Sequence, residues 1–208
     1  MSAYRLHEVL VSQARPTASL KHLFGGITLI IFGFLILSFA YFQVLQQLPN
    51  WPVLRSELFG GMSARALWVM LFNFAPLLLI LGVVVQVVHN RSLDSLLGPR
   101  LLVVLDFKRV LRPVAILFIV VLFIPGPEGA EPIRNLTFGA WAMLLPLSLP
   151  LIFLQISTEE LLFRGYLQSQ LAARFNSPII WMVMPSILFG ALHYDPATYG
   201  PNAIYLAA

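Results

Sequence analysis

Two adjacent carboxylates and an arginine stand within strongly apolar sequence, in the segment Ser157–Gly165 (STEELLFRG). The flanking runs, 135–158 before its carboxylates and 175–194 after its arginine, contain no Asp, Glu, Lys or Arg. The second run closes with Phe189-Gly-Ala-Leu-His193, which adds a titratable imidazole. Ionisable groups at membrane depth are costly, so they usually pair, face a wet cavity and carry function. Two glutamates, one arginine and one histidine therefore suggest a buried, chemically active site.

The composition indicates a membrane protein. Of the 208 residues, 59% are hydrophobic and only 11% are charged, whereas soluble domains are about one quarter charged. The absence of cysteine excludes disulfides, thiolate zinc sites and a cysteine nucleophile. The net charge of +4 does not indicate a nucleic-acid partner, because the basic residues lie in loops between apolar runs. We therefore expect a lipid bilayer around the protein and no nucleic-acid binding.

Apolar runs of about 20 residues are typical of transmembrane helices. The runs cover His22–Gln46, Ala66–His89, Pro113–Pro125, Leu136–Ile156 and Pro178–His193, with a last apolar start at Ala203–Ala208. The partly amphipathic segment Leu101–Leu111 is expected to lie along the membrane interface. The pattern predicts an all-α fold, a multi-pass transmembrane helical bundle that forms a single domain over residues 1–208.

The basic residues predict the orientation. Three precede the first apolar run, two follow it and five follow the second: Arg5, Arg15, Lys21; Arg55, Arg65; Arg91, Arg100, Lys108, Arg109, Arg112. This asymmetry puts the amino-terminal segment 1–21 and the loop Arg91–Arg112 in the cytoplasm. The first run continues apolar past Ser38-Phe39-Ala40, so we expect no signal-peptide cleavage, which fits a bacterial cytoplasmic membrane.

The spacing around Asn176-Ser177-Pro178 predicts a helical hairpin over about 151–194, because proline cannot continue the first helix. Glu160 lies 17 residues before Ser177 and His193 lies 16 residues after it. With a rise of about 1.5 Å per residue, both lie roughly 24–26 Å from the turn. In an antiparallel hairpin the glutamates and the histidine are therefore expected at a similar depth.

Spacing within each helix suggests a division of roles. Glu160 and Arg164 are spaced i, i+4 in the order that favours an intrahelical ion pair. Glu159 is rotated by about 100° from Glu160 and has no such partner. We therefore predict a bracing pair and a chemically active Glu159. Phe189 lies one turn before His193, and we expect it to pack beneath the imidazole or to line the cavity.

The remaining candidates are weaker. His7, His22 and His89 are expected to be interfacial. Asp195, in the turn Tyr194-Asp195-Pro196, could orient His193.

Metal and serine chemistry find little support. The chain has no His-Glu-x-x-His motif, and only His193, Glu159 and Glu160 are at hand as donors, so no metal site or cofactor is assigned. A divalent metal is nevertheless not excluded. No Gly-x-Ser-x-Gly motif occurs, and Ser157 lacks an evident base.

Glu159-Glu160-x-x-x-Arg164 followed by Phe189-x-x-x-His193 resembles the first two motifs of the CPBP family. Its members include type II CaaX prenyl endopeptidases, Abi proteins and bacteriocin-processing or immunity proteins. The resemblance covers about residues 157–195. It implies a glutamate-dependent intramembrane protease in which Glu159 and His193 activate a water and Glu160 and Arg164 brace the site. It also implies an oxyanion-binding His-x-x-x-Asn-type motif on a later helix.

The sequence departs from the family pattern in this third motif. Asn202 is the only amide beyond His193, and no second histidine follows it. The chain is then either a fragment of a longer protein or a shortened member whose chemistry is incomplete. Since the apolar stretch that reaches Ala208 is too short to span a bilayer, we expect a fragment.

These observations lead to one principal hypothesis and two rivals. The principal hypothesis is an intramembrane endopeptidase that hydrolyses a peptide or protein substrate near its membrane anchor. The first rival is a non-enzymatic membrane protein, such as a bacteriocin-immunity or partner-binding scaffold factor, in which the Glu160–Arg164 pair serves only helix packing. The second is a transporter with a proton-relay glutamate, since such residues also mark ion paths.

Overall fold

The computed structural model describes residues 7–60, 63–124 and 135–200, and all regular secondary structure within these ranges is helical. In chain order the elements are α1 (Glu8–Ala14), η1 (Arg15–Thr17), α2 (Leu20–Gln46), α3 (Trp51–Gly60), α4 (Ala64–Phe72), α5 (Phe74–Val87), η2 (Leu93–Leu96), α6 (Arg100–Leu122), α7 (Phe138–Glu160), η3 (Leu161–Leu167), α8 (Gln168–Arg174), η4 (Ile179–Val183), α9 (Met184–Leu192) and α10 (Pro196–Tyr199). Two of the short elements, η1 and η2, are 3-10 helices, whereas η3 and η4 are π-helical. The predicted all-α fold is confirmed. Asn202 and the apolar start at 203–208 lie outside the described residues.

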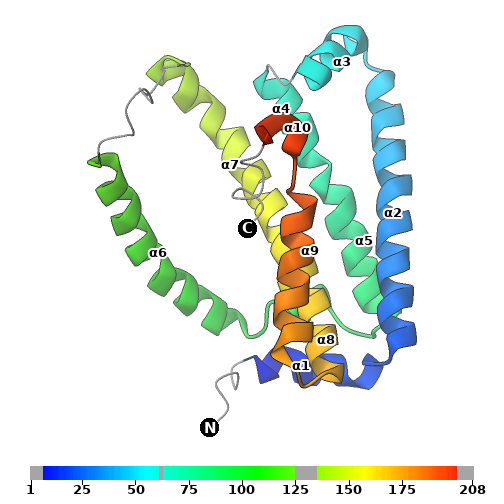
Figure 1. Ribbon diagram of the computed structural model, residues 1–208. Coiled ribbons are helices and arrows are strands. Elements are labelled where there is room, and N and C mark those ends of the chain that lie inside the picture. Colours follow the sequence, from blue (N-terminus) through cyan, green and yellow to red (C-terminus); the bar gives the residue numbers. More distant parts are fainter. Residues whose placement is uncertain (1–6, 61–62, 125–134, 201–208) are drawn as a thin grey trace.

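Three helical segments are long and apolar enough to cross a membrane: Leu20–Gln46, Ala64–Val87 and Phe138–Arg174. A shorter apolar helix covers Ile179–Leu192. These segments alternate in direction, and α2 packs against α5, α5 against α7, and η3 against α9 (Figure 1). The candidate spans indicate an integral membrane protein.

Local sequence explains where the long helices begin and where one of them is interrupted. The Ser19 side chain accepts a hydrogen bond from the His22 N–H and caps α2, and Thr137 caps α7 in the same way. The regular helix of the second span is interrupted at Asn73, between α4 and α5. Pro76 has no N–H, so the Phe72 carbonyl, four residues earlier, lacks its usual helical partner.

Two pairs of segments that were treated separately are each one helix. The apolar run 136–156 and the first helix of the predicted hairpin form a single helix, which runs from Phe138 through η3 and α8 to Arg174. It contains Pro146 and Pro150. Each proline removes only one backbone hydrogen bond, whereas ending a helix in apolar surroundings would leave several backbone groups unpaired.

The segment after Pro99 also differs from its prediction. Leu101–Leu111 and the run from Pro113 were expected as separate elements, but α6 passes through Pro113 as one helix. Every residue of α6 is exposed, and the helix stands apart from the other long helices (Figure 1). Among the described elements none packs closely against α6, so helix propensity on both sides of the single proline carries the helix through it.

The amino-terminal segment is a packed part of the fold. Val11 and Ala14 of α1 are buried, and α1 packs against α8 and η2. Figure 1 shows α1 at the same end of the bundle as the connection between α5 and α6. The two basic regions that were predicted to share the cytoplasmic side therefore lie at one end of the molecule.

The contact between η3 and η2 depends on Gly165. A Cβ added at Gly165 would lie 2.9 Å from the Leu96 Cβ and 3.1 Å from the Leu96 backbone oxygen. Because backbone cannot move aside like a side chain, Gly165→Ala is expected to destabilise the fold by about 1–3 kcal/mol. Thermal unfolding in detergent measures this loss. The matched control is Gly139→Ala in α7, where an added Cβ meets nothing within 4 Å, and equal melting temperatures for the two variants would contradict the prediction.

Candidate active site

The two motif carboxylates lie at the end of α7, directly before the π-helical turn η3. At the far end of this turn the N–H of Gln168 donates to the Phe163 carbonyl, five residues back. The turn includes Phe163 and Arg164, which belong to the same motif. Single π-turns within α-helices occur frequently at functional sites, because the extra residue re-aims the side chains around it.

Glu160 and Arg164 form the predicted ion pair. Arg164 Nη1 donates to both carboxylate oxygens of Glu160, at 2.7 and 2.6 Å. The Arg164 side chain is 73% exposed and the Glu160 side chain 45% exposed, so in water this pair would contribute little to stability. The pair instead fixes the direction of two charged side chains at an open surface.

Glu159 has different surroundings. It is half-buried, and its Oε1 accepts a hydrogen bond from Gln155 Nε2 at 3.3 Å. In the described part of the chain no Lys or Arg forms an ion pair with it. Sequence reasoning missed Gln155, although its i, i+4 spacing to Glu159 was a usable signal. The carboxylate oxygens of Glu159 are therefore not held in an ion pair, in contrast to those of Glu160.

An aromatic ladder joins the two helices of the hairpin. The rings of Phe163 and Phe189 meet edge to face with centroids 5.2 Å apart, and the Phe189 ring lies 4.4 Å from the His193 imidazole. Phe189 thus packs beneath the imidazole, the first of the two arrangements expected for it. Edge-to-face and offset ring pairs of this kind are energetically favourable beyond the area they bury.

The ladder sets the register of the hairpin. The chain turns at residues 175–177, as predicted, and η4 and α9 run antiparallel to η3 (Figure 1). Glu159 lies four residues before Phe163, and His193 lies four residues after Phe189. In antiparallel helices these two offsets point in the same direction along the bundle, so both residues lie about one helical turn beyond the ring pair.

The histidine holds a defined tautomer when it is neutral. His193 is exposed, and its Nδ1 lies 2.8 Å from the Phe189 carbonyl oxygen. A carbonyl can only accept, so Nδ1 carries the proton and Nε2 keeps its lone pair. An imidazole held in this way presents Nε2 as a hydrogen-bond acceptor or a base.

Asp195 does not orient His193. Its Oδ1 accepts hydrogen bonds from the N–H groups of Ala197 and Thr198, both at 3.1 Å, and it thereby caps α10. The hydrogen bonds from Thr198 hold the pKa of the Asp195 carboxyl below its usual range. The alternative role considered for Asp195 was wrong, because the amino terminus of a short helix offers its carboxylate a nearer set of donors.

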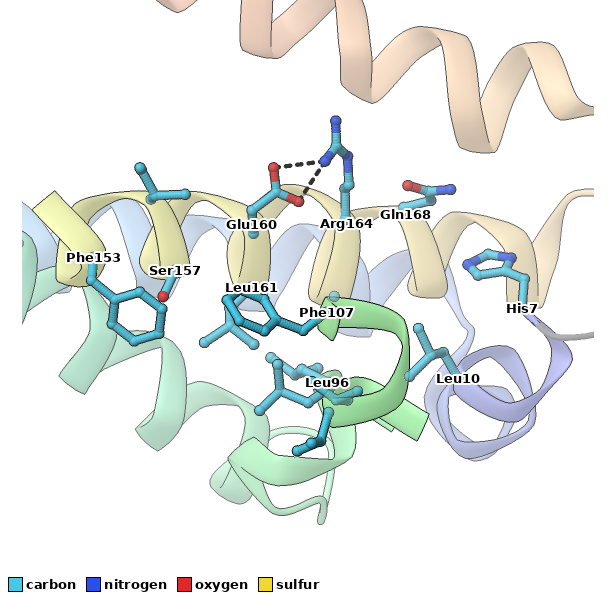
Figure 2. Close-up of a pocket in the computed structure, with 15 residues that line it drawn as sticks. His7, Leu10, Leu96, Phe107, Phe153, Ser157, Glu160, Leu161, Arg164 and Gln168 are labelled. Carbon is cyan, nitrogen blue, oxygen red and sulfur yellow. Dashed lines mark hydrogen bonds and ion pairs between the residues drawn. The ribbon is translucent and has the colours of Figure 1, made fainter. Parts of the chain in front are cut away.

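A cavity of about 760 Å³ opens on one side of the motif helix. It lies between α7 and η3 on one wall and α1, η2 and α6 on the other, and most of its lining is apolar (Figure 2). Figure 2 shows Phe153, Ser157 and Leu161 directed into it, with the Glu160–Arg164 pair along its edge. Cavities of this size accommodate a small ligand or a short apolar segment. Glu160 lines this cavity and Glu159 does not, so the two adjacent carboxylates lie in different surroundings.

Donors for a metal are not gathered at this site. Within residues 7–60, 63–124 and 135–200, no three His, Asp or Glu side chains are grouped closely enough to hold an ion. The structure places Glu160 in an ion pair, which uses both of its oxygens.

His89 was predicted to be interfacial, and this was wrong. It is only 3% exposed and is bonded to Thr17, Tyr166 and Gln170. Asn90 adopts a left-handed conformation with φ of 54° and turns the chain back, so that the Arg91 N–H donates to the Val85 carbonyl. This tight reversal, which a single histidine after an apolar run does not reveal, carries His89 into the protein.

The surroundings of His89 predict a pH dependence of stability. Burial, with Arg91 and His22 adding to it, lowers the pKa of His89 from 6.5 to about 4. The unfolded chain therefore binds a proton at His89 below pH 6.5, whereas the folded protein does so only below about pH 4. The unfolding free energy is expected to fall as the pH decreases through this window. His89→Gln should flatten that slope in pH-dependent melting curves, and an unchanged slope in His89→Gln contradicts the assignment.

Comparison with known proteins bears on the carboxyl-terminal third of the chain, which contains the motifs. Residues 140–208 match the family model of the type II CAAX prenyl endopeptidase Rce1-like proteins. No curated protein and no solved structure matches the chain. The matched region contains Glu159, Glu160 and Arg164, the aromatic ladder and His193, and it agrees with the resemblance derived from the two motifs. Residues 140–208 are therefore an Rce1-like type II CAAX prenyl endopeptidase (CPBP) family domain.

Proposed function

We propose that this protein is an intramembrane endopeptidase that hydrolyses a peptide bond near the membrane anchor of its substrate. The observation that carries the proposal is the Phe163–Phe189 contact, which brings Glu159 and His193 to the same level of the hairpin. Membership of residues 140–208 in a family of protein-cleaving enzymes supports it. A carboxylate and a neutral imidazole at one level can hold a water between them.

In the proposed reaction the Glu159 carboxylate takes a proton from this water while His193 Nε2 accepts its second hydrogen in a hydrogen bond. The water oxygen attacks the scissile carbonyl carbon and forms a tetrahedral intermediate. Protonated Glu159 then gives its proton to the leaving amide nitrogen, and the C–N bond breaks. The Phe189 carbonyl holds Nδ1–H of His193, which keeps Nε2 directed to the water.

The substrate class follows from the cavity beside the motif. Its apolar lining suits an apolar chain or anchor, and the Glu160–Arg164 pair at its edge suits polar backbone next to that anchor. We therefore propose a membrane-anchored peptide or protein as the substrate, CaaX-type or related. The proposed setting is a bacterial cytoplasmic membrane, with α1 and the α5–α6 connection on the cytoplasmic side.

A reconstituted cleavage assay tests this function. The full-length protein in liposomes is mixed with peptides that carry a prenyl anchor, an acyl anchor or no anchor, and products are identified by mass spectrometry. Cleavage of anchored peptides, with little cleavage of the same peptides without an anchor, is expected. Binding of anchored peptides without any product would favour the non-enzymatic rival, in which Glu160 and Arg164 only stabilise helix packing.

A further inference from the structure

A buried hydrogen-bond network lies beside the motif turn. We define the His89 network as Thr17, His89, Tyr166 and Gln170. His89 Nδ1 lies 2.8 Å from Thr17 Oγ1 and 3.0 Å from Gln170 Nε2, and His89 Nε2 lies 2.9 Å from the Tyr166 hydroxyl. The network thus joins η1, the end of α5, the π-turn η3 and α8.

Donor chemistry fixes the direction of these bonds. An amide nitrogen can only donate, so Gln170 Nε2 donates to His89 Nδ1, and His89 Nε2–H donates to the Tyr166 oxygen. Tyr166 is 0% exposed and Gln170 is 1% exposed. Removing one member of such a buried set leaves a polar partner unsatisfied, which costs stability.

The backbone around Tyr166 is shaped to receive its hydroxyl. A Cβ added at Gly26 of α2 would overlap the Tyr166 hydroxyl oxygen and lie 3.1 Å from His89 Nε2. On the other side, the Ser169 hydroxyl lies 2.6 Å from the Gly165 carbonyl oxygen and 3.1 Å from the Tyr166 carbonyl oxygen. A π-turn disturbs the regular ladder of backbone hydrogen bonds, and the Ser169 hydroxyl supplies one further donor to the carbonyls of this turn.

The π-turn links this network to the motif carboxylate. Its extra residue rotates the side chains before it, relative to those after it, by roughly 100° compared with a continuous α-helix. Tyr166 lies in the turn and Gln170 lies after it, whereas Glu159 lies before it. If the turn relaxed to α-helix with Tyr166 and Gln170 still in place, Glu159 would face a different side of the helix.

We propose that the His89 network is a positioning element that holds η3 as a π-turn and thereby keeps Phe163 against Phe189 of α9, with Glu159 four residues before Phe163. Tyr166 is its central positioning residue. The expected effect on kcat rests on the proposed function. The expected effect on the contact between η3 and α9 does not.

Two readouts test the proposal in the full-length protein. Residues 1–208 contain no cysteine, so once any cysteine outside them is replaced by serine, a Phe163→Cys/Phe189→Cys variant can be joined selectively by a short bifunctional thiol reagent. Adding Tyr166→Phe should lower the cross-linked fraction severalfold. In the otherwise natural chain, Tyr166→Phe should lower kcat about tenfold or more with little change in KM, because misplacement weakens chemistry more than binding.

The matched control is Tyr41→Phe. The Tyr41 hydroxyl donates to the Val69 carbonyl at 3.0 Å, so this variant also loses a hydrogen bond between helices, but far from η3. Unchanged cross-linking in Tyr166→Phe, or equal losses in the two variants, would overturn the positioning role. If cross-linking falls as expected while the natural protein cleaves nothing, the proposed function fails and the positioning role stands.

A second variant addresses folding and gives an independent result. Gly26→Ala should displace the Tyr166 hydroxyl and lower the cross-linked fraction, whereas Gly25→Ala, where an added Cβ meets nothing within 4 Å, should leave it unchanged. Because Tyr166→Phe removes the overlapping oxygen, Gly26→Ala combined with Tyr166→Phe should be no worse than Tyr166→Phe alone. Additive losses in the combined variant would contradict a shared mechanism.

Discussion

Glu159→Gln is expected to lower kcat for cleavage of an anchored peptide by about 10²–10⁴-fold, the range typical of losing a general base. The amide keeps the size of the side chain and can still contact Gln155, but it cannot take a proton from water. KM should change little, because the cavity that would receive the anchor is not lined by Glu159. Single-turnover assays in liposomes measure the chemical step directly.

The adjacent carboxylate provides the matched control. Glu160→Gln removes the ion pair with Arg164 and changes the same charge at the neighbouring position. We expect a smaller loss of kcat in Glu160→Gln than in Glu159→Gln, together with a change in KM, because Glu160 lines the cavity. Full activity in Glu159→Gln would refute the role assigned to Glu159, and the reverse ranking of the two variants would exchange their roles.

His193→Phe is the second substitution with a large expected effect. Phenylalanine can still stack on Phe189 but has no Nε2, so the change separates packing from chemistry. A loss of about 10²–10⁴-fold in kcat is expected, again in the range of acid–base catalysis. Melting temperatures of the variant and the natural protein should agree closely, since His193 is exposed.

Combining the two substitutions asks whether the residues act together. If Glu159 and His193 hold one water, Glu159→Gln/His193→Phe should be hardly slower than either single variant, because groups that act as a unit are not additive. Multiplied losses would mean independent roles. The control His22→Phe changes another exposed histidine and should retain the activity of the natural protein.

Features that depend on neighbouring residues in the chain could be predicted from the sequence. Run length and hydropathy identified the first two candidate spans to within two residues at most of their ends, and Pro178 identified the hairpin turn. The i, i+4 spacing identified the Glu160–Arg164 pair, and the one-turn spacing placed Phe189 under His193. These features depend on helical periodicity, which the sequence contains explicitly.

Tertiary packing decided what the sequence did not reveal. Residues from distant segments, such as His89, contact the π-turn at 161–167, so no local sequence pattern predicts it. The burial of His89 depends on the left-handed turn at Asn90 and on a glycine in α2. The cavity forms between segments about 50 residues or more apart in sequence. It could not be predicted without knowing where α6 lies relative to α7.

Hydrolysis in ¹⁸O-labelled water tests the central claim most directly. The natural protein and Glu159→Gln are incubated in liposomes with the anchored peptide, and the product is analysed by mass spectrometry. The account predicts a new carboxyl terminus that carries ¹⁸O in the natural protein, and almost no product in Glu159→Gln. Intact peptide in both samples, or labelled product formed equally by both, would contradict the claim that Glu159 and His193 activate a water for peptide hydrolysis.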